Sequence, residues 1–159
     1  MPAEDNKYLI FNLGKEIYGI PILKVRTIER KMEITPVPGT PGFVKGITNL
    51  RGKIIPVMDL KDKFGIGKIE MTDRICIIIV DIRTDSGAQM HGIIVDGVTE
   101  VLDISDGYIE PLPEGADLRV NRDFMKGLGK IKDMIIILLD IEKILELPEP
   151  ADETKGVNK

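Results

Sequence analysis

The 159-residue sequence contains one histidine, one cysteine and no tryptophan, and aromatic residues make up only 4% of it. One histidine and one cysteine cannot supply a zinc-ligand set of these residue types, and we expect no metal and no cofactor. Sparse aromatic residues and a net charge of −4 argue against nucleic-acid binding, which uses stacking rings and excess cations. The carboxylates are scattered over turns, and we expect no catalytic activity.

Long hydrophobic runs are also missing. The longest, residues 75–80 and 134–139, are far shorter than the roughly 20 residues of a membrane-spanning helix, so we expect no direct membrane insertion. Residues 1–6 lack the basic and apolar regions of a signal peptide, which predicts a cytoplasmic protein with a flexible start. Residues 148–159 begin with a proline and are small and polar, and we expect a disordered tail.

The sequence does contain an internal repeat. Residues 43–60 align without a gap onto residues 124–141, at an offset of 124 − 43 = 81, with identities at Phe43 and Phe124, Gly46 and Gly127, and Asp59 and Asp140. Upstream, Tyr18-Gly19-Ile20 recurs as His91-Gly92-Ile93. The pattern predicts two equivalent halves, residues 7–70 and 71–147, although Ile/Val-rich strands also resemble one another by chance.

The strand patterns predict an all-β fold. Each half opens with a hairpin, over residues 7–20 and 74–95, and each has one short helical turn, over residues 60–64 and 141–145. Asp59 and Asp140 precede these turns as helix caps. Residues 74–80 and 134–139 do not alternate apolar with polar, which predicts strands buried on both faces. We therefore expect each half to form a small barrel with its own core and a third apolar layer between the barrels; a single β-sandwich is the alternative.

The two isolated reactive side chains have structural interpretations. Cys76 stands inside an apolar strand, which is typical of a buried and inert thiol. His91 occupies the repeat position that Tyr18 holds in the other half, which favours a packed strand residue over a general base or a metal ligand.

The two copies of the repeat differ at one turn. Asn49-Leu50-Arg51-Gly52 in the first copy becomes Lys130-Ile131-Lys132-Asp133 in the second. Gly52 permits a turn that holds the Arg51 guanidinium outward, and this planar fork suits a carboxylate on a partner. A solvated turn arginine is the alternative, which charge patterning alone favours.

Four apolar residues also allow two interpretations: Ile22, Val25, Val98 and Val101. Their spacing alone favours an ordinary core. They could also line a groove between the halves that accepts an amphipathic helix.

A further set of motifs extends over nearly the whole of residues 7–147: Phe11-Asn12-Leu13, Tyr18-Gly19-Ile20, Ile22-Leu23-Lys24-Val25, Pro38 with Pro41, Val44-Lys45-Gly46, Asn49-Leu50-Arg51-Gly52, Ile55-Pro56-Val57-Met58-Asp59-Leu60, Gly92-Ile93-Ile94-Val95-Asp96-Gly97-Val98 and Leu138-Leu139-Asp140. Taken together, these motifs resemble those of the CheW-type chemotaxis coupling proteins. The resemblance implies two small SH3-like five-stranded β-barrels, packed through a shared apolar core, in a single domain without catalytic activity.

The same resemblance implies the partners and the site. The family tethers the regulatory domain of the chemotaxis histidine kinase to the cytoplasmic tips of chemoreceptors, in arrays at the inner face of the membrane. It implies partner-binding roles for Gly46 and for the turn of Asn49, Arg51 and Gly52, and a receptor groove at Val25, Val98 and Val101. Thr27 departs from the family, where many members have an acidic residue.

Other classes of protein share this family pattern and can be distinguished from a standalone adaptor by their additional segments. The regulatory domain of the kinase and coupling proteins fused to a receiver domain share the family pattern, but this sequence contains no ATP-binding or phospho-acceptor segment, which favours a standalone adaptor. A small catalytic or ligand-binding β-barrel protein is the alternative from another class.

Overall fold

The computed structural model describes residues 6–84, 87–114 and 121–145. Eleven strands dominate these residues: β1 (Lys7–Leu13), β2 (Glu16–Pro21), β3 (Val25–Glu29), β4 (Val44–Leu50), β5 (Lys53–Asp59), β6 (Cys76–Thr84), β7 (Gly87–Val95), β8 (Gly97–Asp103), β9 (Ile109–Glu110), β10 (Met125–Ile131) and β11 (Met134–Leu139). The helices are short: η2 (Ile22–Lys24), α1 (Leu60–Lys63), η3 (Asp106–Tyr108), η4 (Arg122–Phe124) and α2 (Ile141–Leu145). The expected flexible start and the tail after residue 147 lie outside the described residues, apart from Asn6.

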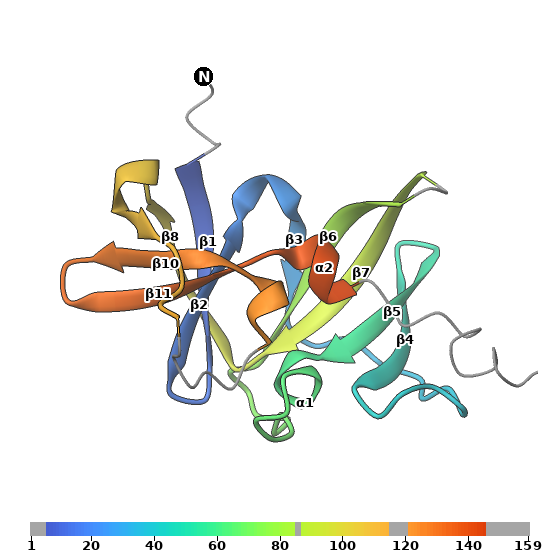
Figure 1. Ribbon diagram of the computed structural model, residues 1–159. Coiled ribbons are helices and arrows are strands. Elements are labelled where there is room, and N and C mark those ends of the chain that lie inside the picture. Colours follow the sequence, from blue (N-terminus) through green and yellow to red (C-terminus); the bar gives the residue numbers. More distant parts are fainter. Residues whose placement is uncertain (1–5, 85–86, 115–120, 146–159) are drawn as a thin grey trace, which may run out of the picture.

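The strands form two sheets that lie side by side, with α1 and α2 near the junction (Figure 1). One sheet has the order β8-β1-β2-β11-β10-β9 and the other has the order β3-β6-β7-β5-β4. Each sheet contains one parallel pair, β2 with β11 and β5 with β7, among antiparallel neighbours. This confirms the expected all-β fold of two small barrels; the first sheet has a sixth strand, the two-residue β9.

Each sheet takes strands from both halves of the sequence. The first-half hairpin β1-β2 lies in the sheet of β8 to β11, and the second-half hairpin β6-β7 lies in the sheet of β3 to β5. The expectation that each half closes its own barrel is therefore wrong. The connections give the reason: only Asp96 separates β7 from β8, and a hairpin needs at least two loop residues, so the chain runs on into the other sheet. Between β2 and β3, the single turn of η2 makes the same crossing.

The repeat nevertheless relates the two sheets strand by strand. β4-β5 and β10-β11 are hairpins at the same place in their sheets, so the pairs Ile54-Ile55 and Ile135-Ile136 lie in equivalent strands, as predicted. In the parallel pairs, Val57 lies opposite Gly92 and Leu138 opposite Gly19. A side chain at either glycine would meet isoleucine, leucine or valine methyl groups at 3.1 to 3.4 Å, so both barrels use a glycine where their interiors are tightest.

Three apolar clusters confirm the expected layers. One fills the barrel of β3 to β7 around Ile77 and Ile79, and one fills the other barrel around Ile10 and Ile136. The largest joins the two sheets: Leu9, Phe11, Leu13, Tyr18, Ile20, Met58, Leu60, Phe64, Cys76, Ile78, Val80, Ile82, Ile93, Val95, Leu139, Ile141, Ile144 and Leu145. The prediction of strands buried on both faces holds for β6 from Cys76 to Val80, but Ile135 of β11 is 60% exposed.

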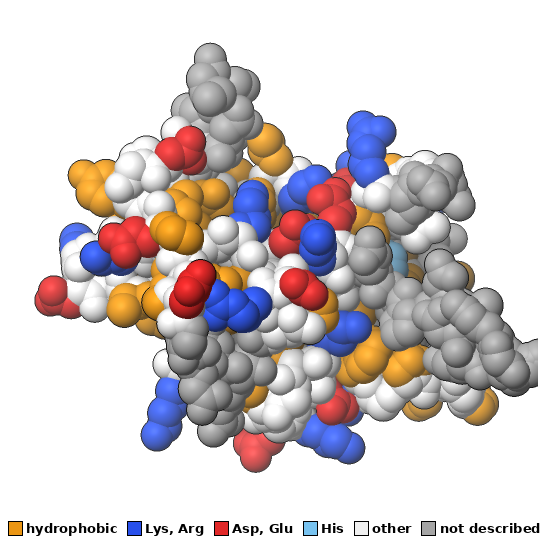
Figure 2. Space-filling view, in the orientation of Figure 1, with side chains coloured by type: hydrophobic (Ala, Val, Ile, Leu, Met, Phe, Trp, Pro, Cys, Tyr) orange, Lys and Arg blue, Asp and Glu red, His pale blue; other side chains and the backbone are white. Residues whose placement is uncertain are grey.

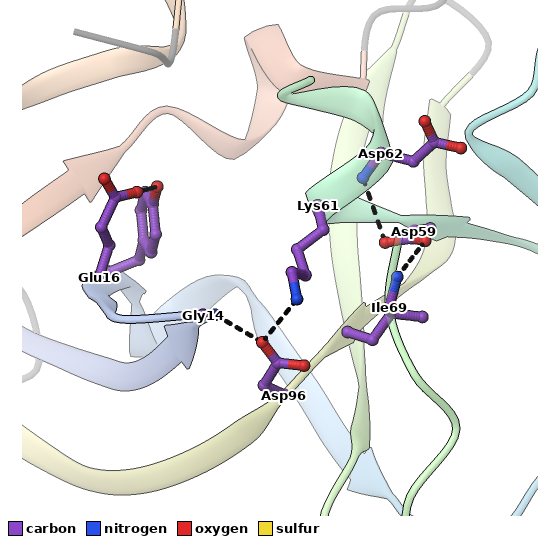
Figure 3. A network of polar contacts seen from close by, with 8 residues as sticks. Gly14, Glu16, Asp59, Lys61, Asp62, Ile69 and Asp96 are labelled. Atoms are coloured by element: carbon purple, nitrogen blue, oxygen red, sulfur yellow. Dashed lines mark hydrogen bonds and ion pairs between the residues drawn. The ribbon is translucent and has the colours of Figure 1, made fainter. Parts of the chain in front are cut away.

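The two helix caps occur as predicted. The buried carboxylate of Asp59 accepts hydrogen bonds from the backbone N–H groups of Asp62 (3.2 Å) and Ile69 (2.9 Å), and Asp140 accepts from that of Lys143 (3.3 Å). Figure 3 shows the Asp59 contacts converging at the start of α1. These aspartates therefore fix the chain where a barrel strand turns into the central layer.

Candidate partner-binding site

The turn between β4 and β5 presents Arg51. Arg51 has a φ of 51° and Gly52 a φ of 89°, so both residues of this two-residue connection are left-handed, as the twist of a hairpin favours. The Asn49 side-chain oxygen accepts a hydrogen bond from the Gly52 N–H at 2.8 Å. Among the described residues, Arg51 has no ion-pair partner. A stiff turn thus holds an unpaired guanidinium in solvent.

A hollow of about 550 Å³ lies beside this turn, and we call it the Arg51 hollow. Its lining combines the cation of Arg51 with the exposed carboxylate of Glu33 and the half-buried one of Glu29. Ile54, which is 59% exposed, adds an apolar wall. Mixed charge beside exposed apolar surface is typical of a protein–protein contact.

Gly46 does not reach a partner through a side chain, and its role is structural. Its φ is 149°, and a Cβ here would lie 2.1 Å from the Thr35 carbonyl oxygen. That carbonyl accepts a hydrogen bond from the Ile47 N–H at 2.9 Å, and the Thr35 N–H donates back to Ile47 at 2.8 Å. Gly46 therefore allows residues around Thr35 to pair with β4 and so positions one side of the Arg51 hollow.

A small apolar pocket of about 180 Å³ lies on the other side of Gly46. Val37, Pro41 and Met58 line it, together with the buried His91. Burial lowers the pKa of His91, and its ring Nε2 lies 3.5 Å from the Gln89 side-chain oxygen. His91 is a packed strand residue, as expected.

The three valines assigned to a receptor groove lie on two edge strands. Val25 on β3 and Val98 on β8 are half-buried, occupy equivalent places in the two sheets, and pack against the central core. Val101 is 46% exposed on β8. As expected, Val25 and Val98 are less buried than Ile78, which is fully buried. The structure places none of the three in the lining of the Arg51 hollow.

An ion-pair network fixes the crossing that leads to β8. Asp96 accepts a hydrogen bond from the Gly14 N–H at 2.5 Å and pairs with Lys61 of α1 at 3.5 Å (Figure 3). Gly14 belongs to the β1-β2 turn, so a single carboxylate joins elements of both sheets. This contact holds the start of β8, including Val98, in a defined place.

Lys63 reinforces the same junction. Its ammonium group lies 4.1 Å from the ring centre of Phe43 and 5.6 Å from that of Phe124, which are equivalent residues of the repeat. Burial lowers the pKa of Lys63. The side chain therefore bridges the two copies at the central layer.

Sequence reasoning missed some of the exposed apolar surface. Ile54 and Ile135 are 59% and 60% exposed, whereas their neighbours Ile55 and Ile136 are buried. Strict strand alternation could have identified the outward pair, but the unbroken apolar runs concealed it. On the face shown in Figure 2, hydrophobic side chains gather over β10-β11 at one end and over β4-β5 at the other.

Thr27 is the position at which the sequence departs from the family pattern. It is half-buried, and its hydroxyl donates a hydrogen bond to the Glu29 carboxylate at 3.1 Å. A carboxylate is therefore close to this position although Thr27 itself carries none.

The described residues contain no group of three or more His, Cys, Asp or Glu side chains arranged to hold a metal ion. Within the same ranges, no helix has the length and apolar character needed to cross a membrane.

Comparisons with known proteins agree with this geometry. Residues 7–149 match the family model described as a CheW-like domain. The chain is 40% identical to the chemotaxis protein CheW of Klebsiella aerogenes, over 91% of this chain and 84% of that protein, and 35% identical to that of Helicobacter pylori, over 90% and 86%. The crystal structure of the scaffolding protein TtCheW from Thermoanaerobacter tengcongensis superposes with a TM-score of 0.79 at 40% identity, covering 90% of this chain and 89% of that one. The chain belongs to the CheW family.

Proposed function

We propose that this protein is a non-catalytic adaptor that couples the regulatory domain of the chemotaxis histidine kinase to the cytoplasmic tips of chemoreceptors. The observation that carries the proposal is the presence of two distinct candidate surfaces on two sheets that share one apolar core. The Arg51 hollow lies at the β4-β5 turn, and the half-buried valines lie on β3 and β8 at the junction of the sheets. A tether needs such separate surfaces because both partners must be bound together.

The kinase contact is assigned to the Arg51 hollow. An exposed arginine without an ion pair can donate to a partner carboxylate without first breaking an internal contact, and Ile54 supplies apolar area beside it. In this proposal Asn49 and Gly52 shape the turn, and Gly46 positions the segment opposite it.

The receptor contact is assigned to Val25, Val98 and Val101. Val25 and Val98 cover part of the central core and remain partly open to solvent, and Val101 adds exposed apolar surface on β8. An amphipathic receptor helix would complete the burial of these side chains. We assign the adaptor domain to residues 7–147 of the sequence. Recruitment to receptor arrays at the inner face of the membrane follows from the receptor contact.

A bridging assay tests the adaptor function. Tagged receptor-tip fragment is immobilised, and capture of the kinase regulatory domain is measured with and without this protein. We expect capture to rise strongly when the protein is added. Retention of neither partner, or of one partner only, would contradict the proposal.

Variants then assign the two surfaces. Arg51→Glu should release the kinase domain while the protein stays on the receptor fragment. Val98→Thr should weaken the receptor step and leave binding of the isolated kinase domain unchanged. If each variant affected both partners equally, the two surfaces would not be separate.

A further inference from the structure

A second hollow, of about 580 Å³, lies on the barrel of β3 to β7, and we call it the basic hollow. Its lining includes four cationic side chains and a single carboxylate: Lys24, Arg26, Lys53, Arg83 and Asp81. Leu23 and Ile54, which are 60% and 59% exposed, give it an apolar floor. The chain as a whole has a net charge of −4, so the positive charge around this hollow is a local feature of the surface.

Two of the four cations are already paired. Lys24 contacts Glu142 at 2.6 Å, and Arg26 contacts Asp81 at 3.4 Å. Within the described residues, Lys53 and Arg83 have no anionic partner. The hollow therefore has exposed apolar side chains and two cations that no described residue neutralises, and together these suit an acidic segment that also contains an apolar side chain.

The chain itself carries such a segment next to the hollow. Glu142 lies on α2, so its contact with Lys24 places α2 at the wall of the hollow, three residues before the described part ends at Leu145. Residues 146–153 then contain four acidic residues, one leucine and no lysine or arginine. Eight extended residues reach up to about 27 Å, and Pro148 and Pro150 disfavour continuation of a helix.

We propose that residues 146–153 dock in the basic hollow of the same molecule. Their carboxylates pair with Lys53 and Arg83, and Leu147 covers Leu23 and Ile54. A short covalent connection gives an effective concentration in the millimolar range, so a contact that would be weak between separate molecules is populated. Ile54 also lines the Arg51 hollow, so the docked segment competes with any partner that needs Ile54.

Paramagnetic broadening in the full chain tests the docking. A nitroxide is attached at Ala151→Cys in a Cys76→Ala background, because Cys76 is the only native thiol. We expect the amide signals of Ala88 and Gln89 to lose most of their intensity at low salt, whereas that of Ile135 on the other barrel keeps it. The loss should disappear near 1 M salt, because the screening length falls from about 30 Å at 0.01 M to about 3 Å.

A charge-reversal pair supplies the control. Lys53→Glu with Arg83→Glu should restore the signals at low salt, whereas Lys126→Glu with Lys132→Glu makes the same change in net charge and should leave the broadening in place. Unchanged signal dispersion in each variant shows that the fold is intact. Full intensity at Ala88 and Gln89 at low salt, or broadening that survives Lys53→Glu with Arg83→Glu, would overturn the proposal.

A mixing experiment separates the two possible sources of the segment. Isotope-labelled protein without a nitroxide is mixed with unlabelled protein that carries it. Intramolecular docking predicts no intensity loss in this mixture. Loss of the Ala88 signal there would mean that a second copy supplies the segment, which would contradict docking within one molecule.

Discussion

The β4-β5 and β10-β11 hairpins occupy the same place in their sheets and differ in the side chains of their turns. Arg51 and Lys132 have φ values of 51° and 55°, and the outward-facing Ile54 and Ile135 are 59% and 60% exposed. The first turn residue and the outward apolar surface are therefore alike in both copies. The second turn residue differs, because Gly52 has a φ of 89° and Asp133 has no positive φ. The side-chain chemistry also differs: a planar guanidinium on an Asn-braced turn in one copy and a flexible ammonium in the other.

This comparison separates what the repeat needs for folding from what one copy adds for binding. Residues that are equivalent in both hairpins, such as Gly46 and Gly127, have close internal contacts. The residues of the solvent-exposed turn differ in chemical type, as Arg51 and Lys132 do. Four predictions test how far this division holds, beginning with the largest expected effect.

The first prediction compares Gly46→Ala with Gly127→Ala. A Cβ at Gly46 would lie 2.1 Å from the Thr35 carbonyl oxygen at a φ of 149°, whereas at Gly127 the nearest atom, the Glu110 carbonyl oxygen, is 2.9 Å away. We expect Gly46→Ala to lower the free energy of unfolding by about 3 kcal/mol or more and Gly127→Ala by about 1 kcal/mol. Urea denaturation measures both, and equal losses would show that the two barrels tolerate a side chain alike.

The second prediction compares Val25→Thr and Val98→Thr with Ile78→Thr. Ile78 is fully buried, so a hydroxyl there should cost about 3 kcal/mol of stability. The half-buried valines should cost about 1 kcal/mol or less and should lose receptor binding with the melting temperature nearly intact. If the valine variants unfold as readily as Ile78→Thr, Val25 and Val98 are core residues and not a groove.

The third prediction concerns the two turns. Arg51→Glu should cost on the order of 2 kcal/mol in kinase binding, about thirtyfold in affinity, with a change of no more than about 0.5 kcal/mol in stability. Lys132→Glu has the same charge change at a residue of similar φ in the equivalent hairpin and should alter binding little. Titration calorimetry measures the affinity of both variants for the kinase domain. Similar small losses of affinity would show that Arg51 is not part of the binding site.

The fourth prediction concerns pH. Burial lowers the pKa of His91 in the folded protein below its ordinary value of 6.5, so the folded state binds fewer protons than the unfolded one. This contribution to stability is complete above pH 6.5 and is lost as the pH falls towards the folded-state pKa, by at most about 1.4 kcal/mol per pH unit. His91→Gln should flatten this part of the stability profile, and an unchanged profile would assign the pH dependence to other groups.

The sequence predicted the elements more reliably than the connections between them. Apolar runs, turn residues and the aspartate caps identify the strands and the helical turns because these signals are local. The exchange of hairpins was missed because β1 and β6 have the same pattern, so β3 could pair with either. The choice depends on the short connections at η2 and at Asp96, each of which carries the chain from one sheet into the other.

The candidate site shows the same limit. The difference between the two copies indicated the turn of Arg51, and the structure adds the hollow beside it. The sequence could not show that Gly46 acts through Thr35, because this contact joins β4 to a segment eleven residues earlier across the bulge at Val44 and Gly46.

The exchanged hairpins also impose an order on synthesis. β2 pairs with β11 through Tyr18 and Ile137, which are 137 − 18 = 119 residues apart. At a synthesis rate of about 5–20 residues per second, the N-terminal hairpin waits roughly 6 to 24 s for its last neighbour. During that time the edge of β2 is open to other strands, so the nascent chain depends on chaperones or on rapid release more than a protein built from two consecutive barrels would.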